Sequence, residues 1–330
     1  MTGKRPVVVA AFEAKDDVLA IIEAGLGDIS TLRFIHGASP EARRAALAES
    51  AAVLTWRPHM EYEAGELAAQ THLGLIQSVT AGIDFVPFEA LPRGVPFATN
   101  AGAYAKPMAE HVMAMTLAAA KALFDRHEKL KRGVFEQWVP TRTLDGATCG
   151  ILGFGGIGRE VARLMRPFGA SIMALNRSGK TDEDVAFAGT LADLDRVLEA
   201  ADVLVLTLSL NKETKGLLGA REFGLMKKDA ILVNVARGAL IDQGALYRHL
   251  SDNPGFTACI EAWWVEPFVH GEFRLDYPLL DLPNVIGAPH NSAVVPGGID
   301  HALRQATLHV RRFLEGETPV NVVTERDRVA

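Results

Sequence analysis

Thr148-Cys-Gly-Ile-Leu-Gly-Phe-Gly-Gly-Ile-Gly-Arg-Glu160 contains the three glycines of a G-x-G-x-x-G motif. The apolar residues before the motif predict a buried strand, and segment 157–168 after it is compatible with a helix. In this context Gly153 would permit the tight turn, Gly155 would let the backbone approach a pyrophosphate, and Gly158 would let the helix pack closely. The free N–H groups at the helix start would then face an anion. A plain structural turn is the alternative, because ordinary strand-to-helix turns also use glycine.

Short apolar runs alternate with helical patterns on both sides of this motif, which predicts parallel sheets in an α/β protein. The expected strands are 7–11, 32–35, 52–55, 75–79, 149–152, 170–175, 203–208, 230–235, 256–260 and 285–287. The expected helices are 16–24, 40–50, 62–70, 105–131, 157–168, 191–200, 220–226, 243–251 and 298–314. The helix at 105–131 has no internal glycine, and the final helix has no strand after it.

A length of 330 residues predicts two domains. The composition, 48% hydrophobic and 22% charged, is that of an ordinary globular protein. The net charge of −6 and the absence of a Lys/Arg block argue against a nucleic-acid partner. No run approaches the ~18 apolar residues of a membrane span, and the first apolar run is too short for a signal peptide, so we expect a cytoplasmic protein. Cys149 and Cys259 lie in apolar runs and are expected as free thiols. No histidine pair has metal-site spacing, so we expect no metal.

Asn176, Arg177 and Ser178 lie at the end of the strand after the motif, 18 residues beyond Gly158. In this fold, an acidic residue about 20 positions beyond the glycine motif usually binds the ribose hydroxyls of NAD. A carboxylate there would repel the 2′-phosphate of NADP, whereas an amide, a guanidinium and a hydroxyl would donate hydrogen bonds to it. The sequence therefore predicts that NADP is preferred over NAD. The alternative is a polar strand end with a solvated arginine.

Charged side chains follow three later strands. Arg237 comes after one strand, Glu261 and Glu266 after the next, and His290 after the third. Ligands of open parallel sheets bind at the carboxyl ends of the strands. Each residue alone is more often structural, but together, beside a nucleotide motif, they predict a reaction centre.

These features together resemble the D-isomer-specific 2-hydroxyacid dehydrogenases over nearly the whole chain. The segments that carry the resemblance are the glycine motif, 202–218, Asn234-Val-Ala-Arg-Gly238, Glu266-Pro267, Pro289-His290, Asn100-Ala-Gly102 and Ala109-Glu-His111. The resemblance implies two doubly wound parallel-sheet domains. A Rossmann-type cofactor domain, 101–292, would be inserted within a flavodoxin-like substrate domain made of 1–100 and 293–330. It also implies a homodimer.

The resemblance further implies roles for individual residues. The implied catalytic residues are Arg237, Glu266 and His290. The implied cofactor-binding residues are Gly153, Phe154, Gly155, Gly156, Ile157, Gly158, Asn176, Arg177, Ser178, Thr207, Leu208, Ser209, Thr214, Val235, Ala236, Arg237, Glu261 and His290. The implied substrate-binding residues are Arg57, Ala81, Gly82, Arg237 and His290. Glu261 stands where the family commonly has Asp near the nicotinamide amide, and Thr207 and Ser209 replace a frequent His and Pro.

The chemistry of a 2-keto acid reductase suits these residues. His290 can donate the proton, Glu266 would orient its ring and favour its charged form, and Arg237 would pair with the substrate's carboxylate and carbonyl oxygen. We expect transfer of a hydride between NAD(P) and a small 2-hydroxy or 2-keto acid, with glyoxylate or hydroxypyruvate as the narrower expectation. The alternatives are a dehydrogenase acting on a different oxyanion and a non-catalytic NAD(P)-sensing protein of the same fold.

Overall fold

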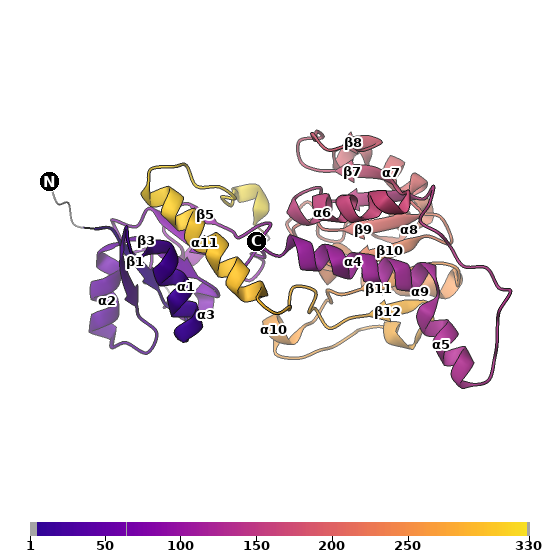
Figure 1. The fold of residues 1–330 in the computed structure, drawn as a ribbon, viewed down its shortest axis with the longest axis horizontal. Coiled ribbons are helices and arrows are strands. Elements are labelled where there is room, and N and C mark those ends of the chain that lie inside the picture. The colour runs from indigo at the N-terminus through magenta and orange to yellow at the C-terminus, as the bar shows by residue number, and fades with distance from the viewer. Residues whose placement is uncertain (1–4, 64, 329–330) are drawn as a thin grey trace. The chain divides into compact units, whose positions relative to one another are not determined.

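The computed structural model describes residues 5–63 and 65–328 and divides the chain into two compact units (Figure 1). Unit 1 is formed by the residues up to Tyr104 together with those from Val295 onward, and unit 2 is Ala105–Val294. The sequence prediction places the two boundaries after residues 100 and 292. No helix of the described residues has the length and apolar character needed to cross a membrane.

Unit 1 contains a five-stranded parallel sheet in the order β2-β1-β3-β4-β5, which is the flavodoxin-like order. Its strands are β1 (Val7–Ala10), β2 (Thr31–Phe34), β3 (Ser50–Thr55), β4 (Leu75–Ser78) and β5 (Phe97–Ala98). Its helices are α1 (Asp16–Leu26), α2 (Pro40–Ala48), α3 (Pro58–Glu61) and α11 (Gly298–Leu314). Apolar clusters cover both faces of the sheet, so the central strands β1, β3 and β4 are almost entirely buried.

The last helix, α11, packs against α1 within unit 1 (Figure 1). A Cβ added to Gly25 of α1 would lie 2.8 Å from the Thr307 hydroxyl of α11, so the glycine allows this close approach. The buried Asn100 amide donates hydrogen bonds to the carbonyls of Val79 (3.0 Å) and Ala302 (2.8 Å). The C-terminal helix is thus joined to the end of β4 through a buried side chain.

Unit 2 contains a seven-stranded parallel sheet in the order β12-β11-β10-β9-β6-β7-β8, the order of a Rossmann fold. Its strands are β6 (Thr148–Leu152), β7 (Ser171–Leu175), β8 (Phe187–Gly189), β9 (Val203–Leu206), β10 (Ile231–Asn234), β11 (Thr257–Ile260) and β12 (Val285–Gly287). Its helices are α4 (Ala105–Ala120), α5 (Leu123–Lys131), α6 (Gly156–Met165), α7 (Leu194–Ala200), α8 (Ala220–Leu225), α9 (Gln243–Asp252) and α10 (Pro267–His270). The strand order reverses between β6 and β9, the position where ligands bind in such sheets. The expected fold class is confirmed.

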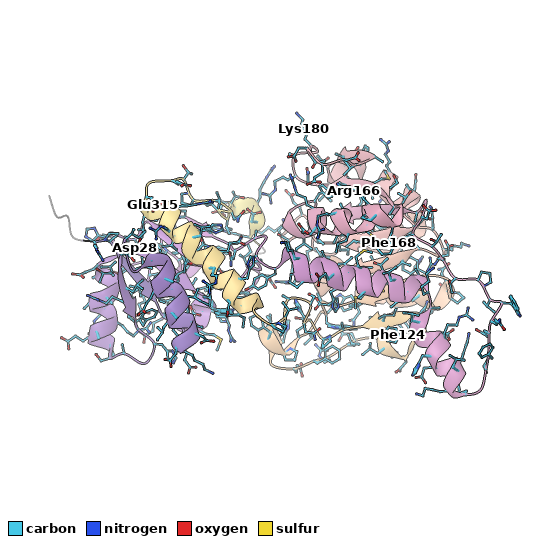
Figure 2. All side chains as sticks on the ribbon, in the orientation of Figure 1. Asp28, Phe124, Arg166, Phe168, Lys180 and Glu315 are labelled. Carbon is cyan, nitrogen blue, oxygen red and sulfur yellow. The ribbon has the colours of Figure 1, made fainter. Side chains whose placement is uncertain are left out.

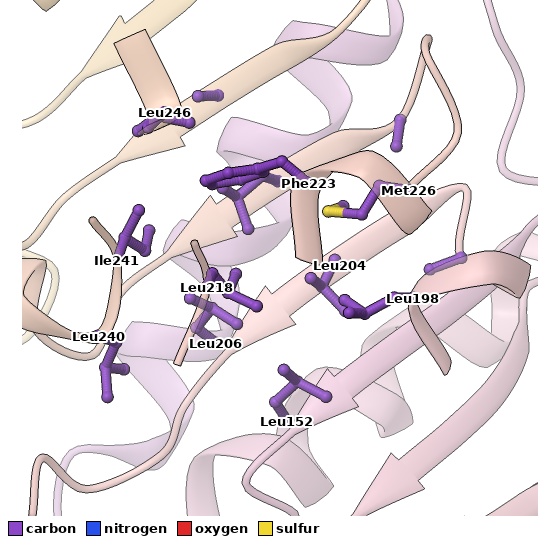
Figure 3. Close-up of a cluster of buried hydrophobic side chains, with 14 of the residues drawn as sticks. Leu152, Leu198, Leu204, Leu206, Leu218, Phe223, Met226, Leu240, Ile241 and Leu246 are labelled. Atoms are coloured by element: carbon purple, nitrogen blue, oxygen red, sulfur yellow. The ribbon is translucent and has the colours of Figure 1, made fainter. Parts of the chain in front are cut away.

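Two apolar clusters cover the faces of this sheet. One of them, drawn in Figure 3, packs residues of β6, β9 and β10 against α7, α8 and α9. Leu152, Leu204 and Phe223 are among its fully or almost fully buried members. The other cluster packs α4 and α6 against the opposite face and includes both cysteines, Cys149 and Cys259. Burial raises the pKa of each thiol to about 12, so both are unreactive packing residues.

Two expected helices are wrong. The single helix at 105–131 is two helices, because Ala122 adopts a left-handed conformation with φ 49°. The Ala120 carbonyl accepts the N–H of Arg142 at this break, and the Lys121 ammonium donates to the Arg142 carbonyl. Arg142, 22 residues beyond Ala120, thus supplies the N–H that the Ala120 carbonyl would receive in a continuing helix.

The helix expected at 62–70 is a series of turns, apart from residue 64, which lies outside the described residues. Gly65 has φ 79°, and the Glu66 carboxylate accepts the N–H of Glu63 and pairs with Arg43 at 2.7 Å. A side chain that bonds the local backbone competes with helix formation. The short strands β5 and β8 were missed by the sequence patterns.

Candidate active site

The glycine turn joins β6 to α6, and its three glycines have different surroundings. A Cβ on Gly153, whose φ is 101°, would lie 2.6 Å from the backbone of Thr207 and Leu208. A Cβ on Gly158 would lie 2.4 Å from the Gly153 carbonyl oxygen. A Cβ on Gly155 would meet no atom within 4 Å. The fold therefore requires glycine at 153 and 158, whereas Gly155 borders open space.

The open space at Gly155 fits the pyrophosphate of a dinucleotide. Gly155 is the N-cap of α6 and makes no side-chain cap, so the first N–H groups of the helix are left for an anion. Gly155 and Gly156 are exposed and Ile157 is partly buried, whereas the Phe154 ring is buried in the core. Phe154 therefore offers the site only its backbone.

The turn is fastened to the neighbouring strand by Thr207. Its hydroxyl donates to the Gly153 carbonyl at 2.6 Å, and its N–H donates to the Leu152 carbonyl at 2.8 Å. Thr207 thus shapes the glycine turn from β9. The backbone nitrogen of Leu208 would lie 2.6 Å from a Cβ on Gly153, and Ser209 is exposed.

The predicted cofactor-binding residue Thr214 has a structural partner, Asn211, that was not among the predicted site residues. The carboxamide oxygen of buried Asn211 accepts the N–H groups of Glu213 (2.9 Å) and Thr214 (3.0 Å). The Thr214 hydroxyl donates to the Ser209 carbonyl at 2.8 Å. Asn followed by polar residues after a strand is the signal of such a turn.

The loop after β7 is organised by Asn176. Its side-chain oxygen accepts the N–H groups of Ser178 (3.0 Å) and Gly179 (2.8 Å), and its amide donates to the Lys180 carbonyl at 2.8 Å. The Asn176 side chain therefore folds the loop through its oxygen and one of the two N–H groups of its amide. Arg177, Ser178 and Lys180 lie exposed on the loop that it forms.

His290 and Glu266 form a hydrogen-bonded pair at the ends of adjacent strands. The Nδ1 atom of His290 lies 2.6 Å from Oε2 of Glu266. The imidazole is 33% exposed, whereas Glu266 is buried. Because Nδ1 faces the carboxylate, Nε2 is the atom that can exchange a proton with a substrate.

Glu266 is itself held by the loop that carries it. Its Oε1 accepts the N–H of Trp263 at 2.5 Å, while the indoles of Trp263 and Trp264 donate to the carbonyls of Ala288 (2.8 Å) and Ile241 (2.7 Å). A Cβ on Gly238 would lie 2.3 Å from the Trp263 backbone, so glycine allows these loops to touch. The loops after β10, β11 and β12 are therefore fastened to one another.

The charges around this pair favour an ionised carboxylate and a protonated imidazole. Burial alone would raise the pKa of Glu266, but the hydrogen bond and charge of His290, the Trp263 N–H and Arg237 together lower it. Burial alone would lower the pKa of His290, but the hydrogen bond to Glu266 and the charges of Glu261 and Glu266 raise it, against the opposing charge of Arg237. The pair thus holds its proton on the histidine.

Arg237 follows β10 in an extended conformation and its charge acts on both His290 and Glu266. The buried Asn234 positions it by donating to the Arg237 carbonyl (2.9 Å) and accepting the Ala236 N–H (3.0 Å). Val235 and Ala236 are buried, so they can offer a ligand only their backbone. Arg237 is the cation of this group of strand-end residues.

The other predicted substrate residues lie in unit 1. Arg57 follows β3, and its N–H donates to the Glu61 carboxylate at 2.7 Å. Ala81 and Gly82 follow β4 in a loop where the Thr80 hydroxyl donates to the Gly82 carbonyl at 3.2 Å. In the described part of the chain, no hydrogen bond uses the N–H of Ala81 or Gly82 as a donor.

Comparisons with known proteins give the family of this chain. The family model for the NAD binding domain of the D-isomer specific 2-hydroxyacid dehydrogenases matches residues 113–292. The chain belongs to that family. It is therefore an oxidoreductase that acts on CH–OH groups with a nicotinamide cofactor.

Several named proteins are similar to this chain. A glyoxylate reductase of Aeropyrum pernix is 30% identical over 78% of this chain and 78% of its own length. A D-3-phosphoglycerate dehydrogenase of Methanocaldococcus jannaschii is 32% identical over 76% of this chain and 47% of its own length. A solved D-isomer specific 2-hydroxyacid dehydrogenase of Xanthobacter autotrophicus, 23% identical, has the same fold, with a TM-score of 0.78 over 98% of both chains.

Proposed function

We propose that this dehydrogenase reduces small 2-keto acids, with His290 as the proton donor, Glu266 as its partner and Arg237 as the cation that binds the substrate. The observation that supports this most is the 2.6 Å contact between His290 Nδ1 and Glu266 Oε2. A buried carboxylate on one ring nitrogen fixes the ring and leaves the other nitrogen for chemistry. The same contact keeps the imidazole protonated, as an acid requires.

Each residue has a separate role in the reduction. When bound, the nicotinamide cofactor would supply the hydride for the carbonyl carbon of the keto acid. The proton on His290 Nε2 goes to the carbonyl oxygen, which leaves a neutral imidazole and a 2-hydroxy acid. Arg237 steadies the negative charge that builds on this oxygen and pairs with the substrate carboxylate. Glu266 stays ionised and keeps the ring oriented.

Arg237 and His290 are proposed to bind the substrate. Arg57 and the backbone N–H groups of Ala81 and Gly82 are proposed as further substrate-binding groups because of their resemblance to the family. Two adjacent N–H groups without an internal acceptor suit a carboxylate, because each can donate to one oxygen. The small keto acids proposed are glyoxylate and hydroxypyruvate, and the name of the Aeropyrum pernix relative supports the first.

The proposed cofactor is NADP in preference to NAD. Arg177, Ser178 and Lys180 are exposed on the loop after β7, and no carboxylate occupies position 176. Two cations and a hydroxyl favour a 2′-phosphate over a bare hydroxyl. The remaining cofactor contacts are proposed for the glycine turn, residues 207–209, Thr214 and residues 235–237.

One assay tests both the activity and the cofactor preference. Oxidation of NADPH and of NADH is followed at 340 nm with a series of small 2-keto acids. We expect turnover of glyoxylate or hydroxypyruvate, with kcat/KM at least about tenfold higher for NADPH. Equal kcat/KM with both cofactors would contradict the preference. Bound cofactor without turnover of any keto acid would instead support a sensing protein.

We also propose a homodimer formed through α5 and the segment that follows it, called here the arm (residues 123–139). The arm extends from the sheet of unit 2 (Figure 1), and Phe124 is exposed on it (Figure 2). Phe135 is 75% exposed and Trp138 is 87% exposed. Glu136 pairs with Arg126 (2.5 Å) and Lys129 (3.1 Å), which holds the arm in shape. An ordered apolar surface of this kind marks a protein interface, and a second copy related by twofold symmetry can cover it.

The arm can be tested by charge substitution. The double variant Phe135→Glu/Trp138→Glu is expected to be a monomer, because two carboxylates would be desolvated in the interface. Light scattering should give twice the chain mass of 35.5 kDa for the wild type and a single chain mass for the variant. The control Phe168→Glu changes an exposed Phe of the same unit outside the arm (Figure 2) and should remain dimeric. A dimeric arm variant would place the interface elsewhere.

A further inference from the structure

Glu261 connects the loops at the ends of three strands. It is the first residue after β11 and is fully buried. Its backbone N–H donates to the Asn234 carbonyl at the end of β10 (3.0 Å), and its carbonyl accepts the N–H of His290 (3.1 Å). Its carboxylate oxygen Oε1 accepts the N–H of Ser292 at 2.8 Å. Glu261 therefore holds the loop that carries His290 by one backbone hydrogen bond and one side-chain hydrogen bond.

These hydrogen bonds stabilise an unfavourable backbone conformation, because His290 is left-handed with φ 50°. Residues with a Cβ disfavour this region, so the surrounding contacts must impose it. The N–H groups of His290 and Ser292, which Glu261 accepts, lie on either side of this left-handed residue's Cα. The ring is then aimed at Glu266, which holds it at 2.6 Å.

The Glu261 carboxylate also brings charge. Its second oxygen, Oε2, is buried and has no hydrogen-bond partner in the described residues. A buried charge acts strongly on its neighbours, because little water screens it. Glu261 and Glu266 favour the charged form of His290, whereas Arg237 and burial oppose it. Two carboxylates thus act together on one imidazole.

We propose that Glu261 is a positioning residue for the catalytic acid, which holds residues 290–292 in shape and favours the protonated imidazole. Its side chain does so from inside the protein, without contacting the cofactor. This inference rests on the proposed role of His290 as the proton donor. It assigns to Glu261 a role different from the nicotinamide contact expected from the resemblance, because the carboxylate is turned to the Ser292 N–H.

Two substitutions separate the two parts of this role. Glu261→Gln keeps an oxygen that can accept the Ser292 N–H but removes the charge. Glu261→Asp keeps the charge but is one methylene too short to reach that N–H. Glu222→Gln is the matched control, because the Glu222 carboxylate accepts a backbone N–H in the same way, from Gly219 at 3.0 Å, outside the site.

The titration of His290 is measured by NMR in each variant, with His290→Asn used to identify its signal among the ten histidines. Cofactor binding and the pH profile of ketoacid reduction are measured beside it. In Glu261→Gln we expect His290 to titrate at lower pH, with an unchanged Kd for NADPH. In Glu261→Asp we expect kcat to fall roughly tenfold from misalignment of the acid, with the midpoint of the pH profile retained.

The outcomes are distinguishable. The same His290 titration in Glu261→Gln and in the control would overturn the inference. Weaker NADPH binding with an unaltered His290 titration would overturn it in favour of a cofactor contact. If His290 proved dispensable for turnover, the proposed function would fail, yet a lowered midpoint in Glu261→Gln would still support the action of Glu261 on His290.

Discussion

Replacing His290 by asparagine is expected to reduce kcat for ketoacid reduction by about a thousandfold, the range typical of a lost general acid. The substitution removes Nε2, the only atom of the pair placed to give a proton to the substrate. Asparagine is the suitable replacement because it tolerates the left-handed conformation that His290 adopts, whereas alanine would add backbone strain. The Kd for NADPH, measured by fluorescence, should change little.

Two further variants make this result specific. Glu266→Gln can still accept a hydrogen bond from Nδ1 but lacks the charge that favours the imidazolium, so we expect a smaller loss than for His290→Asn. His301→Asn, on the exposed surface of α11, should behave as the wild type. A His290→Asn enzyme with more than about a tenth of wild-type kcat would show that another group donates the proton.

Gly155→Val is expected to weaken NADPH binding by about a hundredfold or more while leaving the fold intact. A Cβ at this position meets no protein atom within 4 Å, and the backbone φ of −93° lies outside the left-handed region that favours glycine. The valine would instead fill the space at the start of α6 that a pyrophosphate needs. Calorimetric titration with NADPH measures the loss, and thermal unfolding without cofactor should be unchanged.

Gly158→Ala is the matched substitution at the other end of the turn. Its Cβ would lie 2.4 Å from the Gly153 carbonyl oxygen, so α6 must move away from the sheet. We expect it to lower the free energy of unfolding by about 1–3 kcal/mol, as overpacking does. Tight NADPH binding by Gly155→Val would mean that the cofactor does not approach the turn there.

The glycine motif illustrates which structural features could be predicted from the sequence alone. Its spacing predicted a strand, a turn and a helix, and Gly153 and Gly158 are the positions that the packing requires. The alternation of apolar runs predicted both parallel sheets. The sequence also marked Arg237, Glu266 and His290, because strand-end residues of a parallel sheet meet at one edge. Local pattern was enough for these features.

The remaining features depend on contacts between distant residues. The break at Ala122 depends on Arg142, and the turns at 62–70 depend on Arg43. The role of Asn176 in its loop depends on the Lys180 carbonyl, which accepts a hydrogen bond from its amide, and the sequence does not show this contact. The inward direction of Glu261 depends on Ser292, 31 residues further along the chain. Propensity and spacing carry no information on such partners.

The central claim is that one imidazole gives the proton during reduction and takes it back during oxidation. The most direct measurement is the pH dependence of kcat/KM of the wild-type enzyme in both directions. Glu266 and Glu261 hold the pKa of His290 above its ordinary value of 6.5. Reduction needs the protonated ring, so its kcat/KM should be full at low pH and fall as the pH rises through that pKa. Oxidation of the 2-hydroxy acid needs the neutral ring and should rise through the same pH. Midpoints below 6.5, or the same direction of change in both reactions, would contradict the account.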